Sequence, residues 1–183
     1  MTYLLSLSTA RWSVLFSISL LLMTCSDSLP QPTRTGNYTF GCKINGKKWI
    51  PDGGTGFTPA KPISGGFFLV PSRGYETVIN IYAVSKDGQR LGLYIDESKI
   101  GSFDLNFNTQ PSPASLSPKS YGLYRATDGN EYITSSRNTG KIVITRADTL
   151  SGIISGTFFF TAGNNSGDKI STTEGRFDYV RKR

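Results

Sequence analysis

The feature that most constrains this chain is an alternation of apolar and polar residues over short runs. The alternation is clearest in Arg90–Asp96, Phe103–Phe107 and Thr173–Val180. A period of two is that of a β-strand, because successive side chains of a strand point to opposite faces of the sheet. The sequence of the domain lacks the 3.6-residue period of an amphipathic helix. The pattern therefore predicts an all-β fold.

Turn residues separate these runs at regular intervals. Asn45-Gly46 divides two short runs, and Asp87-Gly88, Asp128-Gly129-Asn130 and Asn164–Gly167 do the same further along the chain. Asn-Gly is a strong hairpin signal, because a type I′ turn needs a positive φ at both central residues. The spacing predicts an antiparallel β-sandwich or a curled open barrel of about nine strands.

Two segments interrupt the strand pattern. Residues 51–65 are rich in Gly and Pro, and residues 108–118 contain three prolines, which a strand cannot accommodate in its interior. Phe67–Val70, between them, is a short apolar run. Both interruptions read as loops within one domain, because residues 38–183 are of the size that forms a single core. We therefore predict a single all-β domain over 38–183.

The N-terminal segment has the pattern of an export signal. Trp12–Thr24 carries no charge, follows Arg11 and is too short to span a bilayer as a helix. Leu22 stands three residues before Cys25, an arrangement that resembles a bacterial lipobox. The resemblance implies a lipoprotein signal peptide over 1–24 and acylation of Cys25. An ordinary signal peptide that is cleaved elsewhere is the alternative.

Residues 25–37 contain Pro, Thr and Ser without an apolar period, which predicts a flexible tether. Acyl chains on Cys25 would hold the protein on a membrane, since two or more chains give stable anchoring. Ser26-Asp27 resembles a short signal that sends some lipoproteins to the cell surface, and a plain polar linker is the alternative. The expected location is the cell envelope, at the outer membrane, with the domain facing the periplasm or the cell surface.

Both ends of the domain resemble a family of Bacteroidota envelope lipoproteins of unknown function. The opening hairpin Phe40–Trp49 (FGCKINGKKW) carries one part of the resemblance, and Ser155–Ala162 (SGTFFFTA) with Thr173–Asp178 (TEGRFD) carries the other. The family implies an all-β envelope domain, and it supplies no catalytic residues. The same motifs also have a folding explanation, because their glycines permit close approach of another backbone and their Phe side chains suit a core.

Candidate catalytic groups are few. The chain contains no His, so a Ser-His-Asp triad, a Cys-His pair and a His metal site are excluded. Cys42 lies in a strand-like run and is expected to be a small buried hydrophobe. Glu174 and Asp178 share a strand face but are about 13 Å apart along the strand, too far for a glycosidase pair, with Arg176 between them as their expected charge partner. We predict a protein that is not an enzyme, without catalytic residues, a metal site or a cofactor.

The chain has a formal net charge of +7, but its basic residues are dispersed. Without a basic stripe interleaved with aromatic residues, nucleic-acid binding is not expected. The expected partners are the membrane, through acylated Cys25, and an envelope protein or glycan. Tyrosines in strand-like runs could stack on a sugar or a peptide, although tyrosine is also an ordinary strand residue. The candidates are Tyr75, Tyr82, Tyr94, Tyr121, Tyr124 and Tyr132.

Two tripeptides, Asp27-Ser28-Leu29 and Asp148-Thr149-Leu150, resemble the acceptor of Bacteroidota O-glycosylation. Ser28 and Thr149 are therefore candidate glycosylation residues, and Ser28 is favoured because it lies in the expected tether.

The pattern favours a lipid-anchored binding or interaction module that presents loops such as 51–65 and 108–118. A lipocalin-like barrel that holds a small apolar ligand is the alternative, and a hydrolase that uses carboxylates alone is a third. A ligand-sized cavity inside the strands would favour the barrel, and a core filled by aromatic side chains would favour the module.

Overall fold

A computed structural model describes residues 28–111 and 115–181 of the chain. In this part, eleven strands form one antiparallel sheet that is not closed into a barrel. The strands are β1 Thr39–Ile44, β2 Lys47–Trp49, β3 Ile63–Val70, β4 Glu76–Val84, β5 Arg90–Ile95, β6 Gly101–Asp104, β7 Tyr121–Arg125, β8 Glu131–Ile133, β9 Gly140–Asp148, β10 Ile153–Gly163 and β11 Lys169–Val180, and a short 3-10 helix, η1, covers Pro71–Arg73. The all-β prediction is confirmed, with two strands more than expected.

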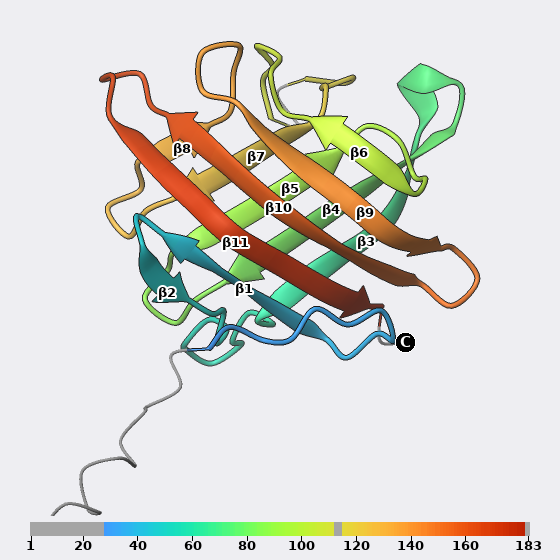
Figure 1. The fold of residues 1–183 in the computed structure, drawn as a ribbon, viewed down its shortest axis with the longest axis horizontal. Coiled ribbons are helices and arrows are strands. Elements are labelled where there is room, and N and C mark those ends of the chain that lie inside the picture. The colour runs from blue at the N-terminus through green and yellow to red at the C-terminus, as the bar shows by residue number, and fades with distance from the viewer. Residues whose placement is uncertain (1–27, 112–114, 182–183) are drawn as a thin grey trace, which may run out of the picture.

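The sheet folds over itself into two layers, so the sandwich alternative holds. A front layer contains β6-β9-β10-β11-β1-β2, and a back layer contains β8-β7-β5-β4-β3. The strands of the two layers cross in Figure 1. The layers are joined at one corner, where β10 pairs with β8 through Gly163 and Ile133. At the opposite corner β11 approaches β3, but the two strands do not pair in the described residues.

The expected hairpins form at the expected turns. Asn45 and Gly46 both have positive φ, at 49° and 78°, as a type I′ turn requires. The turns at Gly88, Gly129 and Gly167 connect β4 to β5, β7 to β8 and β10 to β11.

Two strand boundaries differ from the expectation. β3 begins at Ile63, inside the predicted loop, because Gly65 and Gly66 continue the ladder with β4. β6 ends at Asp104, and Phe107, expected to continue its alternation, is half exposed. Leu105 still reaches the core, since its N–H donates to the Gly140 carbonyl at the start of β9.

The space between the layers is filled by apolar side chains. Phe40 lies at the centre of an aromatic cluster, with ring centroids 5.3 Å from Phe158, 6.1 Å from Trp49 and 6.4 Å from Phe177. These rings belong to the buried core that both layers share. Trp49 therefore belongs to the core between the layers.

Candidate functional site

The acidic side chains do not converge on a reaction centre. Among the described residues, no group of three or more His, Cys, Asp or Glu side chains could hold a metal ion. Glu174 forms an ion pair with Lys43 at 2.6 Å and lies 3.9 Å from Arg176. Asp178, four residues further on, is completely buried and hydrogen-bonded to a different part of the chain. The two carboxylates on this strand face therefore have separate structural partners.

The segment 28–37, which we call the N-terminal strap, lies along the outer surface of the front layer (Figure 1). Leu29 is only 6% exposed, and the Pro30 ring lies against Gly41 of β1. Arg176 of β11 donates to the Pro30 carbonyl at 3.2 Å. This arrangement differs from the flexible tether expected for residues 25–37, because backbone and side-chain contacts fix the part from residue 28 onward.

Asp178 holds the second half of the strap. Its carboxylate accepts hydrogen bonds from the backbone N–H groups of residues 35, 36 and 37 at 2.9 to 3.1 Å. The hydroxyls of Ser155 and Thr33 also donate to it, each at 2.6 Å. Burial raises the pKa of Asp178, but these hydrogen bonds outweigh burial and hold the pKa below its ordinary value. An ionised carboxylate of the last strand therefore locks the first described segment onto the fold.

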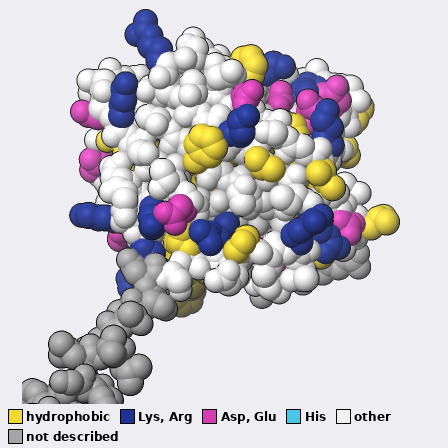
Figure 2. All heavy atoms as spheres, in the orientation of Figure 1, with side chains coloured by type: hydrophobic (Ala, Val, Ile, Leu, Met, Phe, Trp, Pro, Cys, Tyr) yellow, Lys and Arg dark blue, Asp and Glu magenta, His cyan; other side chains and the backbone are white. Residues whose placement is uncertain are grey.

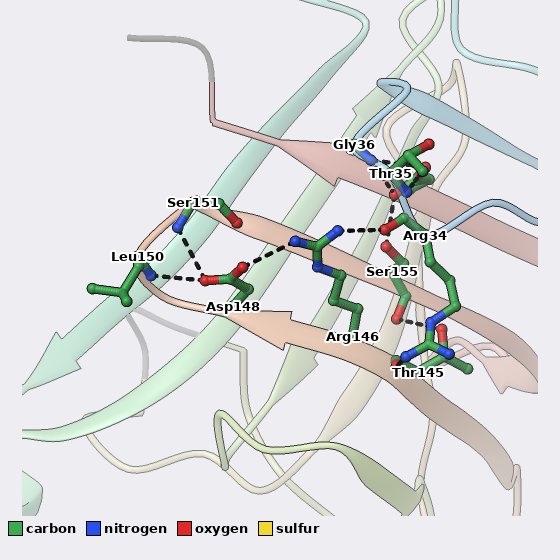
Figure 3. A network of polar contacts seen from close by, with 10 residues as sticks. Arg34, Thr35, Gly36, Thr145, Arg146, Asp148, Leu150, Ser151 and Ser155 are labelled. Carbon is green, nitrogen blue, oxygen red and sulfur yellow. Dashed lines mark hydrogen bonds and ion pairs between the residues drawn. The ribbon is translucent and has the colours of Figure 1, made fainter.

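Two arginines extend this attachment to β9 (Figure 3). Arg34 of the strap donates to the Thr145 carbonyl at 2.6 Å, and Arg146 donates to the Arg34 carbonyl at 2.7 Å. Arg146 also forms an ion pair with Asp148 at 3.0 Å. Asp148 in turn accepts hydrogen bonds from the N–H groups of Leu150 and Ser151. The hydrogen bonds from Ser151 and from Arg146 lower the pKa of Asp148. The network connects the strap to the β9–β10 turn.

The candidate modification residues lie in different surroundings. Cys25 is outside the described residues, and Ser28, the first described residue, is exposed next to buried Leu29. Thr149 is exposed in the β9–β10 turn, beside Leu150, which is 92% exposed. The described part of the chain contains no helix long and apolar enough to cross a bilayer.

The back layer carries a recess of about 300 Å³ on its outer face, which we call the back-layer recess. Its apolar lining comes mainly from β3, β4 and the loop before β7, and includes Phe68, Val70, Val78, Leu116 and Pro118. Ser72 donates to the Leu116 carbonyl at 2.9 Å and so holds this loop over β3.

One polar atom in the wall of the recess lacks a partner. The side-chain oxygen of Asn80 is buried without a hydrogen bond, whereas its amide nitrogen donates to the Tyr82 hydroxyl at 2.9 Å. A buried acceptor without a donor is costly, so this oxygen lowers the local stability of the recess wall.

The edge strand β3 borders the recess. In the described residues β3 pairs only with β4. The Tyr179 hydroxyl donates to the Gly65 carbonyl at 2.9 Å, and the Tyr38 hydroxyl donates to the Ile63 carbonyl. These two side chains, from the front layer, cover the first half of the edge. The second half, with Phe68 and Leu69 exposed to 46% and 64%, lies beyond them.

Most of the candidate stacking tyrosines are not available to a ligand. Tyr94 and Tyr121 are buried and stack on each other with ring centroids 5.2 Å apart. Tyr124 is buried too, and its hydroxyl donates to Gln89 at 2.9 Å. Tyr82 and Tyr132 are half-buried. Of the six, only Tyr75 is largely exposed. Tyr94 and Tyr121 are buried because the outer face of the back layer has a small core of its own, which they form with Val78, and Tyr124 belongs to the core between the layers.

Cys42 is completely buried and forms no disulfide. Burial raises the pKa of its thiol to about 12, so the reactive thiolate is suppressed at neutral pH. The expected role of Cys42 as a small buried hydrophobe is confirmed.

Comparison with known protein families gives a match over more than half of the chain. Residues 73–181 match a family described as a domain of unknown function, DUF6252. The match extends from η1 to the end of β11, so the strap and the opening hairpin lie outside it. No curated protein and no solved structure matches the chain.

Proposed function

The chain belongs to the DUF6252 family, and because the function of that family is not known, we propose one from the geometry. The protein is a lipid-anchored interaction module of the cell envelope. Its binding element is the second half of β3 with the back-layer recess, and its partner is an extended, apolar polypeptide segment.

The observation that carries this proposal is the orientation of the β3 backbone. Ile63 and Gly65 direct their carbonyls away from β4, toward the hydroxyls of the two capping tyrosines. Strand geometry repeats every two residues, so Phe67 and Leu69 direct their backbone groups to the same edge. An edge of this kind pairs with an added strand through main-chain hydrogen bonds.

The side chains around the edge define the chemistry of the partner. Phe68 and Leu69 are exposed, and the recess beside them is lined by apolar groups, which favours an apolar segment over a charged one. Main-chain pairing would supply affinity, and the recess would select the side chain of the partner.

The strap supports the anchored arrangement. Its contacts with Asp178 and Arg176 fix the position at which the chain enters the fold, close to Cys25 in sequence. Because the chain enters the fold at a fixed point, acylation of Cys25 would also fix the direction in which the β3 edge faces.

The alternatives have less support. The lipocalin-like barrel needs an internal ligand cavity, but the aromatic rings around Phe40 occupy that space, and the back-layer recess lies on the outer face. The carboxylate-dependent hydrolase needs two facing acids in a cleft, but Glu174 and Asp178 are bound to Lys43 and to the strap.

Photocrosslinking in intact cells tests the binding element. A photoreactive residue is placed at Phe68, and the crosslinked product is compared with and without Leu69→Lys, because a lysine guards an edge strand against pairing. Leu150→Lys is the matched control, since Leu150 is also exposed but lies in the β9–β10 turn. We expect Leu69→Lys to abolish the product and Leu150→Lys to retain it. A product that is insensitive to Leu69→Lys would refute the β3 edge as the binding element.

The anchor is tested separately. Intact-mass analysis of membrane-extracted protein should give a mature N-terminus at Cys25 with acyl chains, and Cys25→Ser should remove both the modification and membrane retention. An unmodified wild-type N-terminus would refute anchoring without affecting the crosslinking result.

A further inference from the structure

We propose that the anchored domain rests on the bilayer through a defined surface, which we call the membrane pole: the loop 50–62, with Phe57 at the lipid interface, and the lysines around it. The proposal rests on the anchoring at Cys25 put forward above and adds an orientation to it. Its partner is an anionic lipid surface.

The first argument is the length of chain between anchor and fold. The strap contacts the fold from its first described residues onward, and Cys25 is separated from Ser28 by only three Cα-to-Cα steps. Such a segment spans at most about 10 Å, whereas a free tether from 25 to 37 would span up to about 40 Å. With acyl chains on Cys25, the headgroups would therefore lie within about 10 Å of the surface around Ser28.

The second argument is what lies at that surface. In Figure 1 the loop between β2 and β3 lies in the same lower left part of the view as the start of the strap, and it follows Trp49, which pairs with Cys42 next to the Gly41–Pro30 contact. Its base is fixed, because Gly53 donates to the Val84 carbonyl and Gly54 donates to the Ala60 carbonyl, both at 2.9 Å. Phe57 lies between these points and is fully exposed, at 104% of its reference area. A large aromatic side chain held out from a fixed loop is suited to the membrane interface.

The third argument is charge. Residues 47–62 and 85–90 carry five Lys or Arg side chains against two Asp. Lys61 and Lys86 are exposed, and Asp52 is paired with Lys86 at 3.5 Å. Dark blue side chains lie at the lower left of the face in Figure 2, the part of the view that holds the start of the strap in Figure 1. An apolar tip with a basic rim is the composition of a surface that binds anionic lipid.

The buried state of Cys42 allows a direct test with the anchor installed chemically. In a chain that begins at Cys25, a maleimide lipid will modify Cys25, because Cys42 is completely buried. The lipidated protein is placed in vesicles of phosphatidylethanolamine and phosphatidylglycerol, and Phe57→Trp reports depth through quenching by brominated lipid. Leu150→Trp is the matched control, since the β9–β10 turn lies at the opposite side of the view in Figure 1.

After subtraction of the Trp49 emission measured in the lipidated wild type, we expect blue-shifted, strongly quenched emission from Phe57→Trp and unquenched emission from Leu150→Trp. Adding Lys61→Glu to Phe57→Trp should reduce the quenching, and adding Lys99→Glu, at another exposed lysine, should not. Equal quenching at positions 57 and 150, or none at 57, would overturn the membrane pole. Because the lipid is attached in vitro, this outcome is independent of whether cells acylate Cys25.

Discussion

Gly175 lies directly opposite Phe158 in the β10–β11 ladder, and the Phe158 ring occupies the space that a side chain at 175 would need. A Cβ atom built on Gly175 would be 2.5 Å from the ring. The relationship is reciprocal two rungs away, where Gly156 lies opposite Phe177 and a Cβ would be 2.7 Å from that ring. The closing motifs are therefore matched pairs of a glycine and a phenylalanine.

Gly175→Ala should destabilise the domain by about 2 kcal/mol, because an added methyl group would force the Phe158 ring out of a tightly packed core. Urea denaturation followed by tryptophan fluorescence measures the free energy of unfolding. Gly101→Ala is the control, because a Cβ there meets its nearest neighbour at an ordinary 3.7 Å. Equal stability of the two variants would contradict the packing argument.

Replacing Asp178 should release the strap. Asp178→Asn keeps the size of the side chain but removes the charge that accepts hydrogen bonds from Ser155, Thr33 and the strap backbone. Hydrogen bonds to a charged group contribute about 2 kcal/mol each, so we expect a loss of at least about 3 kcal/mol in the free energy of unfolding. Limited proteolysis should then cleave within residues 28–37 of the variant and spare the wild type.

The effect of Asp178 should also depend on pH. Its pKa is lowered in the folded state, so its contribution is complete above the ordinary Asp pKa of about 4 and is lost as the pH falls through the folded-state pKa. Denaturation curves of wild type and Asp178→Asn should therefore be far apart at neutral pH and converge in acid. A difference in stability that stays constant with pH would exclude the carboxylate as its source.

The sequence predicted the strands and turns well because both are encoded locally. Asn45-Gly46 can form the type I′ turn with little help from the rest of the chain, and period two in β11 follows from the burial of the face that carries Gly175, Phe177 and Tyr179. The motif glycines could be recognised as packing positions, but their partners Phe158 and Phe177 became visible only with the β10–β11 register.

The strap and the tyrosine positions could not be predicted in the same way. Residues 28–37 look like a linker because their contacts are to Asp178 and Arg146, more than 100 residues away. The single local signal was Gly36, whose positive φ lets the backbone wrap around the carboxylate. The burial of Tyr94 and Tyr121 is not visible in the sequence, because alternation does not indicate that the outer face has a small core of its own.

Cys42 should behave as an inert thiol in the folded protein. Its pKa is raised to about 12 by burial, so the thiolate fraction at pH 8 is about one part in ten thousand even before access is considered. Iodoacetamide should leave Cys42 unmodified in native protein and alkylate it completely in denaturant, as intact mass measures. Rapid alkylation of Cys42 in the native protein would indicate that β1 separates from the core.

Glycosylation, if it occurs on this chain, should favour Thr149 over Ser28. Thr149 and Leu150 are both exposed in a hairpin turn, whereas Leu29, next to Ser28, is buried where the strap packs against β1. An enzyme that recognises the whole tripeptide can therefore reach Asp148-Thr149-Leu150 without disturbing the fold. Glycopeptide mass spectrometry of protein from the native host, with Thr149→Ala and Ser28→Ala as references, measures the occupancy. Higher occupancy at Ser28 would mean that modification precedes docking of the strap.

Removing the hydroxyl of Tyr179 should weaken the protection of the β3 edge. That hydroxyl donates to the Gly65 carbonyl at 2.9 Å, and Tyr38 donates to the next capped carbonyl at Ile63. Tyr179→Phe keeps the ring in the core but leaves the Gly65 carbonyl without its donor, which costs about 1 kcal/mol of stability. An uncovered edge also favours edge-to-edge association, so sedimentation velocity should show more dimer for Tyr179→Phe than for wild type. Adding Leu69→Lys to this variant should restore the monomer, because a lysine further along the same edge guards β3 against pairing. A dimer that survives Leu69→Lys would place the contact elsewhere on the protein.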